Sequence, residues 1–196
     1  MTKRLLSLAA LVVLAALPLS ASQFIQLPFD QVARQATVIV RATVGPVTSA
    51  WDDDREVIFS TATLSVRRYL AGSGPQTLMV REAGGTVGDY TQVAIGFPEL
   101  REGQEVVLFL SPWDDSADYR IEAYNQGKYR VKMTPHGEMV SPDPDTQGHE
   151  RTFDGGVGRV RAAAADEEHG FSIDELSSMI TAARGASERP QFDRRK

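Results

Sequence analysis

Apolar side chains recur along this chain at the spacings of β-strands, which predicts a mainly β protein. Residues 37–44 and 105–111 are apolar on both faces of an extended strand, as in strands buried on both sides. Residues 57–70 instead alternate, with apolar residues on one face and threonine, serine and arginine on the other. At roughly 3.4 Å per residue this strand would be about 47 Å long, so we expect it to be bent or bulged. The predicted strands span residues 37–44, 57–70, 77–82, 105–111, 119–124 and 128–131.

Turn-forming residues separate these strands. Gly45-Pro46 ends the first strand, and the charged segment Trp51–Asp54 forms the turn before the second. A Gly-Ser-Gly-Pro turn follows at 72–75, and a loop with three glycines runs from Gly84 to Glu102. The last two strands are expected to form a hairpin around 125–127.

Two short helices are predicted, one before the first strand and one near the C-terminus. Apolar residues recur at helical spacing over 29–36, directly after Pro28, a residue suited to the first turn of a helix. Ser172–Glu175 has the form of a capping box, and the apolar stripe that follows it ends at Gly185.

Five or six strands preceded by a short helix predict a small closed β-barrel. The composition changes to Pro, Asp, Gly and His after the last strand, so we expect a linker there. The predicted organisation is a signal peptide at 1–22, a barrel domain at 23–132, a linker or excursion at 133–170, a helix at 171–185 and a disordered tail at 186–196.

Residues 1–22 are typical of a secretory signal peptide. A short basic region precedes an apolar run over 5–19, which is shorter than a transmembrane helix requires. The small residues at 20–22 suit a cleavage site, so we expect cleavage before Gln23, with cleavage after Ala21 as the neighbouring alternative. An uncleaved membrane anchor is the other alternative. We therefore expect a secreted or periplasmic protein.

The chain contains no cysteine, so it must fold on apolar burial without disulfides. Thiolate zinc sites, thiol nucleophiles and redox pairs are excluded for the same reason. The net charge of the chain is −5, and removal of Lys3 and Arg4 with the signal peptide would leave −7. An acidic surface repels phosphate backbones, so we expect no nucleic-acid partner. We also expect no stable membrane insertion after cleavage.

The order of segments over 37–131 resembles the netrin-like, tissue-inhibitor-of-metalloproteinase-like OB-fold. It runs from the strand TVIVRATV through a long strand ending in VRRYLAG to GPQTLMVRE, REGQEVVLFLSP and YNQGKYRV. It is closer still to uncharacterised secreted bacterial proteins with the same order. The resemblance covers about half of the chain and implies an OB-like barrel, closed or partly open, rather than an activity. Inhibitors of this family place an N-terminal cysteine on the target's zinc; the segment from Gln23 has none, so no inhibitory residue is carried over.

The three histidines form no recognisable catalytic or metal motif. His136, His149 and His169 all lie outside the predicted barrel and lack the paired helical spacing of a zinc protease. Their nearby carboxylates leave a metal-assisted hydrolase as the least favoured alternative function.

Other sequence features also fail to specify a reaction. The acidic clusters at 52–54, 114–118 and 143–145 lack the complete loop of a calcium site, which leaves weak surface calcium binding as an alternative. The glycines at 84–88 match neither a dinucleotide fingerprint nor a phosphate loop, and no Gly-x-Ser-x-Gly motif is present. We therefore assign no catalytic, cofactor-binding or metal-binding residue and expect no enzyme activity and no cofactor.

Aromatic residues in the predicted loops are the remaining candidates for a binding site. Trp51 and Trp113 lie beside runs of aspartate, and Tyr90 and Phe97 lie in the loop before the buried strand. Exposed aromatics at loop tips are frequent interface anchors, although aromatics at strand ends also cap barrels. We predict that these four residues contribute to an interface.

These observations favour a non-enzymatic binding or regulatory module that acts on another extracellular or envelope protein. The family resemblance makes a secreted protease one such partner. A structural or accessory envelope protein is the main alternative.

Overall fold

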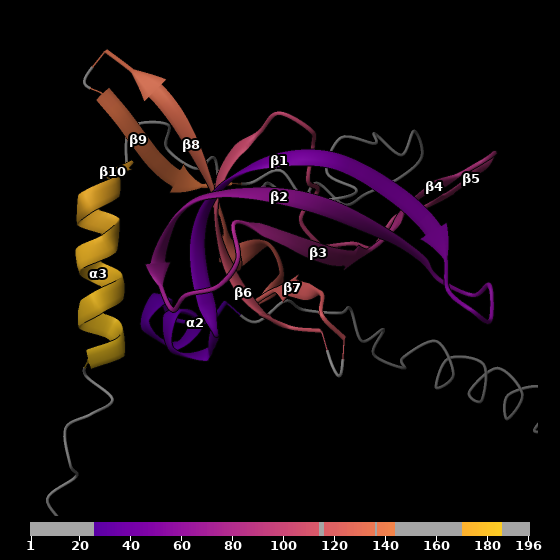
Figure 1. The fold of residues 1–196 in the computed structure, drawn as a ribbon, viewed down its shortest axis with the longest axis horizontal. Helices are drawn as coiled ribbons and strands as arrows, with labels where there is room; N and C mark the ends of the chain where they lie inside the picture. Colours follow the sequence, from indigo (N-terminus) through magenta and orange to yellow (C-terminus); the bar gives the residue numbers. More distant parts are fainter. Residues whose placement is uncertain (1–25, 114–115, 136, 144–169, 186–196) are drawn as a thin grey trace, which may run out of the picture.

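The structure is a computed structural model that describes residues 26–113, 116–135, 137–143 and 170–185 (Figure 1). The predicted signal peptide and C-terminal tail lie outside these residues. The described part of the chain is mainly β, as the sequence predicts. Its elements are α2 (Phe29–Gln35), β1 (Val38–Trp51), β2 (Ile58–Ala71), β3 (Thr77–Ala83), β4 (Gly85–Val87), β5 (Tyr90–Gln92), β6 (Glu105–Pro112), β7 (Tyr119–Ile121), the 3₁₀ helix η1 (Tyr124–Gly127), β8 (Lys128–Thr134), β9 (Gly137–Pro142), β10 (Phe171–Ser172) and α3 (Ile173–Gly185).

Five of the strands close into a barrel. β1 pairs with β2, β2 with β3, β6 with β7, and β6 returns to β1, all antiparallel. A parallel bridge between Val80 of β3 and Tyr119 of β7 closes the ring. The circular order is therefore β1-β2-β3-β7-β6-β1, the connectivity of a small Greek-key barrel of the OB type. The predicted fold class, a small OB-like barrel with a helix on each side of it in the sequence, is confirmed.

The apolar residues of β1 and β6 serve two separate cores. In β1, Val40 points into the barrel while Ile39 points to its outer side; in β6, Leu108 points in and Phe109 points out. This division explains why both strands are apolar on both faces. The barrel interior consists of Val38, Val40, Ala42, Val44, Ala62, Leu64, Leu78, Val80, Val106, Leu108, Leu110 and Ile121.

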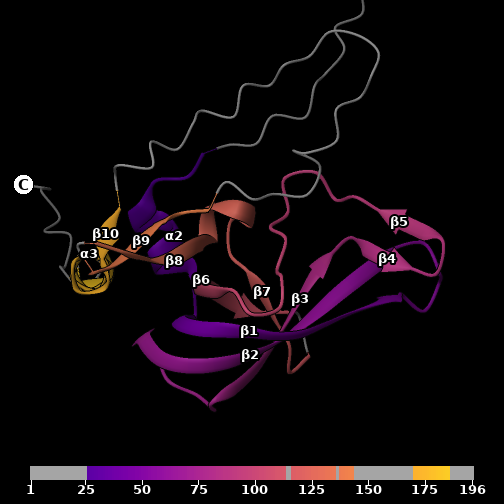
Figure 2. The same ribbon diagram turned by 90° about the horizontal axis from the view of Figure 1, so that it is seen from above.

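The two helices cover the outer core at one end of the molecule, where α2 packs against α3 and β6, and α3 lies beside β9 and β10 (Figure 2). Arg184 of α3 donates a hydrogen bond to the carbonyl of Ala36 at the end of α2, with a distance of 2.8 Å. Arg34 of α2 donates in return to the carbonyl of Ala183 at 3.5 Å. Each arginine thus satisfies a carbonyl that the end of the other helix leaves open. The C-terminal helix therefore packs against the same core as the strands.

The long strands β1 and β2 project past the barrel as a bent ribbon (Figure 1). The prediction that Gly45-Pro46 ends the first strand is wrong, because β1 continues to Trp51. The pairing register with β2 shifts between Val44 and Val47, so Pro46 lies in a bulge. A bulge tolerates proline because the ladder does not need its missing N–H there.

The predicted glycine-rich loop contains a short hairpin, β4–β5, that packs against the far half of this ribbon. Gly85 begins the hairpin with a φ of +135°, a conformation that favours glycine. A Cβ atom at this position would also collide with the hydroxyl groups of Ser49 and Ser60. Only glycine lets the hairpin approach the ribbon this closely.

The predicted hairpin between 119–124 and 128–131 is wrong. β7 and β8 do not pair with each other; both pair with β6, which is long enough to hold β7 at its C-terminal half and β8 at its N-terminal half. The 3₁₀ helix η1 connects them. β8 then pairs with β9, which lies inside the range predicted as a linker. Residues 144–169 of that range lie outside the described residues.

The start of α3 agrees with the predicted capping box. The Ser172 amide donates to the Glu175 carboxylate at 2.7 Å, and the Glu175 amide donates to the Ser172 hydroxyl at 3.2 Å. Within the part of the chain that the structure describes, neither helix is long and apolar enough to cross a membrane.

Candidate functional site

Phe59, Arg81 and Trp113 gather on the outer surface of the barrel, and we call them the Phe59–Arg81–Trp113 cluster. Phe59 lies on β2 and Arg81 on the adjacent strand β3, whereas Trp113 directly follows β6. Ile58 and Val80, their chain neighbours, are buried, so the alternation of the strands points Phe59 and Arg81 outward. Three elements that are distant in sequence therefore meet at one point.

The cluster brings one guanidinium group against two aromatic rings. The rings of Phe59 and Trp113 meet edge to face, with centroids 5.5 Å apart. The Cζ atom of Arg81 lies 4.2 Å from the Phe59 centroid and 5.8 Å from the Trp113 centroid. Both distances fall within the range of cation–π attraction. The rings therefore hold the guanidinium in place.

Arg81 makes no ion pair with any described residue. Its contacts with the two rings are cation–π contacts and use none of the five N–H donors of the guanidinium in an ion pair. No described residue forms an ion pair with these donors, so a group from outside can bind them. The cluster can therefore bind a hydrogen-bond acceptor beside an aromatic surface.

Local hydrogen bonds fix the backbone of Trp113. Its amide donates to the Asp118 carbonyl at 2.8 Å, and its own carbonyl accepts the Ser116 hydroxyl at 2.8 Å. On the other side of the cluster, Met79 is 39 % exposed and Thr63 lies opposite it on β2. The cluster therefore borders an exposed part of the sheet that carries both polar and apolar side chains.

Of the four aromatics predicted to form an interface, only Trp113 belongs to this cluster. Trp51 pairs with the buried Ile58, whereas Phe59 pairs with Ala50, so Trp51 and Phe59 point to opposite faces of the ribbon. The ring of Trp51 contacts that of Tyr90, with centroids 5.9 Å apart. Trp51 and Tyr90 therefore form a separate pair at the β4–β5 end of the molecule.

Phe97 forms a third group, together with Tyr124 of η1. Their ring centroids are 4.9 Å apart. Ala123 and Tyr124 both have positive φ angles, 54° and 58°, which are strained for residues with side chains. The four predicted residues are thus distributed over three places, and each contacts an aromatic partner of its own.

Sequence reasoning missed Phe59 and Arg81. The alternation of residues 57–70 does place Phe59 opposite Ile58, so the outward direction of its ring was available from the pattern. The contact of Phe59 with Arg81 depends on the register in which β2 pairs with β3. The contact of Phe59 with Trp113 depends on the closure of the barrel. Neither the pairing register nor the closure of the barrel can be predicted from this sequence alone.

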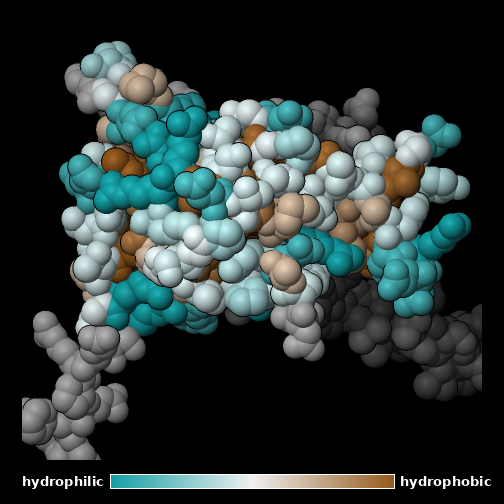
Figure 3. Space-filling view, viewed as in Figure 1, coloured by the Kyte–Doolittle hydropathy of each residue, from teal (hydrophilic) through white to brown (hydrophobic). Residues whose placement is uncertain are grey.

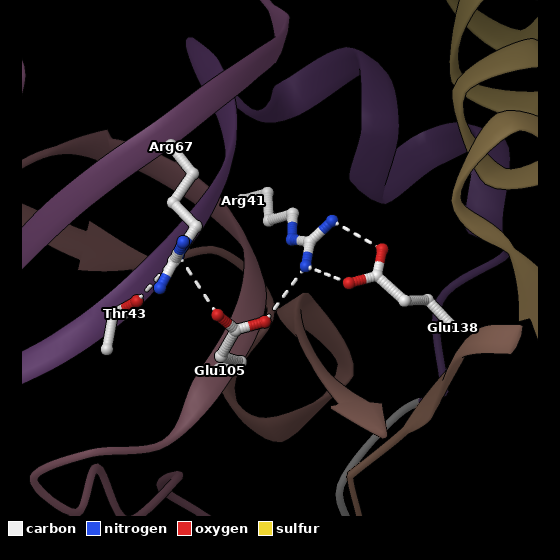
Figure 4. A network of polar contacts seen from close by, with 5 residues as sticks. All are labelled: Arg41, Thr43, Arg67, Glu105 and Glu138. Carbon is white, nitrogen blue, oxygen red and sulfur yellow. Dashed lines mark hydrogen bonds and ion pairs between the residues drawn. The ribbon is translucent and has the colours of Figure 1, made fainter. Parts of the chain in front are cut away.

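A network of arginines and glutamates lies where β1, β6 and β9 meet (Figure 4). Arg41 of β1 binds both oxygens of Glu138 at 2.7 and 2.6 Å, and it binds Glu105 at 2.9 Å. Arg67 of β2 contacts Glu105 at 3.0 Å and donates to the Thr43 hydroxyl at 3.0 Å. The bidentate pair ties the β8–β9 hairpin to the barrel.

The electrostatics of this network indicate a structural role. The hydrogen bond that Arg41 donates to Glu138 raises the pKa of Arg41, and the same bond lowers the pKa of Glu138 below its usual value. General acid–base catalysis at neutral pH would need a carboxyl group with a raised pKa, and Glu138 is shifted the opposite way. The network holds elements together and does not resemble a catalytic pair.

Two further charged groups are buried. Lys128 is fully buried and pairs with Asp143 at 3.1 Å, while its ammonium also donates to the Glu99 carbonyl. Glu82 is 4 % exposed inside the barrel and accepts the Ile121 amide at 2.6 Å. Burial raises the pKa of Glu82 to about 8, although the Ile121 amide and Arg120 act in the opposite direction.

Metal ligands do not converge among the described residues, where no group of three or more His, Asp or Glu side chains is arranged to hold an ion. His136, His149 and His169 lie outside the described residues. The predictions that the chain has no metal site and no catalytic site therefore remain predictions.

The surface seen from the side of Figure 1 carries apolar residues in small separate patches between polar ones (Figure 3). The exposed large apolar residues of the described chain are Met79, Tyr90, Val93, Ile95, Tyr124 and Met133. Such isolated residues are ordinary on a protein surface. Side-chain chemistry therefore distinguishes the Phe59–Arg81–Trp113 cluster more clearly than apolar area does.

Comparison with known proteins gives no relative from which a function could be carried over: no family model, no curated protein and no solved structure matches the chain. The resemblance to the netrin-like OB-fold thus stays a resemblance in the order of segments.

Proposed function

We propose that this chain is an exported, non-enzymatic module that binds another extracellular or envelope protein through the outer face of β2 and β3. The contact is centred on the Phe59–Arg81–Trp113 cluster. A secreted protease is one partner that fits the resemblance noted in the sequence. The contact of two aromatic rings with an arginine that forms no ion pair among the described residues is the observation that carries the proposal.

The composition of the cluster supports binding to a protein. Tryptophan, tyrosine and arginine are the residues most enriched among those that dominate binding energy at protein interfaces. Their positions on strands and on a braced loop restrict their motion, so little conformational entropy is lost on binding. The side chains are half-buried and fixed by one another, as anchors of an interface are.

The position of the cluster on the barrel supports the same function. In OB barrels, the face of the second and third strands and the loop between the last two strands form the usual ligand surface. Here these elements are β2, β3 and the loop after β6 that carries Trp113. This is an analogy of fold, and the residues themselves supply the chemistry.

The experiment compares partner recovery by four forms of the immobilised mature chain. The medium and envelope fraction of the producing cell is passed over the unchanged chain, over Trp113→Ala, over Met79→Arg and over Tyr90→Ala. Tyr90 is 68 % exposed and belongs to a different aromatic pair, so its variant is the matched control. Met79→Arg adds a bulky charge to the same face without touching the core.

We expect the unchanged chain and Tyr90→Ala to recover one protein in a fixed ratio. Trp113→Ala and Met79→Arg should recover it at least about ten-fold less well, since loss of an interface anchor costs about 2 kcal/mol or more. Equal recovery by all four forms, or no partner at a fixed ratio, would contradict the proposal. Circular dichroism of each variant separates loss of binding from loss of the fold.

A further inference from the structure

A second arginine lies next to the cluster. Val80 and Tyr119 form the parallel bridge between β3 and β7, so Arg81 and Arg120 are the next residues along two adjacent strands. Both strands alternate in the same sense there, because Ile121, like Val80, points into the barrel. Arg120 is exposed, and it therefore lies on the outer surface beside Arg81.

Neither arginine forms an ion pair with a residue that the structure describes, although Arg120 lies close enough to the buried Glu82 to oppose the rise of its pKa. The other described arginines of the barrel strands bind carboxylates: Arg41 binds Glu105 and Glu138, Arg67 binds Glu105, and Arg68 binds Asp174. Asp118, on the loop beside β7, forms no ion pair with either Arg81 or Arg120. Asp114 and Asp115 lie outside the described residues. A local pair of positive charges therefore remains on a chain whose net charge is −5.

From this arrangement we infer that the face binds a carboxylate-bearing, extended segment of a partner protein. Arg81, within cation–π distance of Phe59 and Trp113, offers its N–H fork to a carboxylate, and Arg120 adds charge beside it. The inference rests on the proposed function, because it names the chemistry of the partner at the same face. Aromatic contacts and carboxylate recognition would together give the site its specificity.

The described residues favour a carboxylate on a protein over the phosphates of a nucleic acid. A planar guanidinium matches a carboxylate through two parallel hydrogen bonds. Binding of single-stranded nucleic acid relies on a basic groove that follows many phosphates, and the excess of acidic residues opposes this. Two arginines on one face suit one or two carboxylates.

The test titrates the mature chain with a fluorescein-labelled octapeptide that contains four glutamates and one tyrosine. A peptide with four glutamines in place of the glutamates is the matched probe, and an eight-nucleotide thymidine strand is the competing class of ligand. The protein variants are Arg81→Gln, Arg81→Lys and Arg120→Gln. Arg55→Gln is the control, because Arg55 is an exposed arginine at the far end of the ribbon.

We expect the glutamate peptide to bind at least ten-fold more tightly than the glutamine peptide or the thymidine strand, and its binding to weaken with salt. Arg81→Gln should weaken binding of the glutamate peptide at least ten-fold, and Arg120→Gln should weaken it by a smaller factor. The affinity of Arg81→Lys for the glutamate peptide should lie between those of the unchanged chain and Arg81→Gln, because lysine keeps the positive charge but lacks the paired N–H donors of the guanidinium. Arg55→Gln should bind as the unchanged chain does.

Three results would overturn the inference: no binding of the glutamate peptide, equal binding by the unchanged chain and Arg81→Gln, or tighter binding of the thymidine strand. Partner recovery separates this failure from failure of the proposed function. If the partner is still recovered and Trp113→Ala still abolishes recovery, the face binds a protein by other chemistry. If recovery does not depend on Trp113, the proposed function fails as well.

Discussion

The carboxyl group of Glu82 lies inside the barrel, and its pKa is raised from 4.5 to about 8 because burial disfavours the charged form. Between these two pH values the folded chain holds a proton at this position that the unfolded chain releases. The free energy of unfolding therefore decreases as pH rises from about 4.5 to about 8, and this contribution is constant above that range.

Glu82→Gln should remove this dependence. The amide oxygen of glutamine can still accept the Ile121 amide, but the side chain has no charge to lose. We expect the variant and the original chain to have similar free energies of unfolding near pH 4. Above pH 8 the free energy of unfolding of the variant should be higher by an amount on the order of a few kcal/mol. Urea unfolding of both chains at pH 4 and pH 9 measures the difference, and an identical difference at the two pH values would contradict the account.

The buried pair of Lys128 and Asp143 makes a second prediction at this scale. Lys128→Met removes the ammonium 3.1 Å from the Asp143 carboxylate, which also pairs with Arg130 at 3.4 Å. Loss of one partner of a buried pair costs about 3–5 kcal/mol, whereas replacing both by apolar residues costs much less. We therefore expect Lys128→Met to be strongly destabilising and Lys128→Met with Asp143→Leu to recover part of the loss.

Urea unfolding of the two single variants and the double variant gives the coupling energy between the two residues. A cost below about 1 kcal/mol for Lys128→Met alone would show that the pair does not hold the end of β9 as the structure indicates.

At the level of elements, the β8–β9 hairpin is attached to the barrel through Arg41 and Glu138. Arg41 lowers the pKa of Glu138 below 4.5, so the contact stabilises the folded chain above that pH. The contribution is lost as pH falls through the lowered pKa of the folded state. Glu138→Gln should therefore speed amide hydrogen exchange in β9 at pH 7, and the difference from the original chain should shrink in acid.

Glu102→Gln is the control, since Glu102 is exposed and forms no ion pair in the described structure. It should exchange in β9 as the original chain does at both pH values. If Glu138→Gln changes nothing at pH 7, or changes exchange equally at pH 7 and pH 3, the network of Figure 4 does not hold the hairpin.

The elements that the sequence predicts correctly are those with a strong local signal. The capping box at Ser172–Glu175 and the two-sided apolar strand 105–111 are examples, because each depends on neighbours in the chain. The prediction that the first strand ends at Pro46 is wrong because Pro46 lies in a bulge, where proline does not interrupt the strand. Pairing of β7 and β8 with β6 is a long-range choice that no local pattern encodes.

For the whole molecule, closure of the barrel decides where function can lie. It separates Trp51 from Trp113 and brings Trp113 to Phe59 and Arg81, which come from other strands. The sequence predicted that loop aromatics contribute to an interface, and Trp113 remains a candidate on that basis. The arginine that completes the cluster was missed because its role arises only from strand pairing.

The central claim is that the outer face of β2 and β3 meets another protein, and site-specific photo-cross-linking in the producing cell tests it most directly. A photoreactive phenylalanine analogue replaces Met79 on this face or, as the control, Met133 on the β8–β9 hairpin, which is 75 % exposed. The account predicts a covalent adduct with one protein from position 79 that is absent from position 133. No adduct from position 79, or the same adduct from both positions, would contradict it.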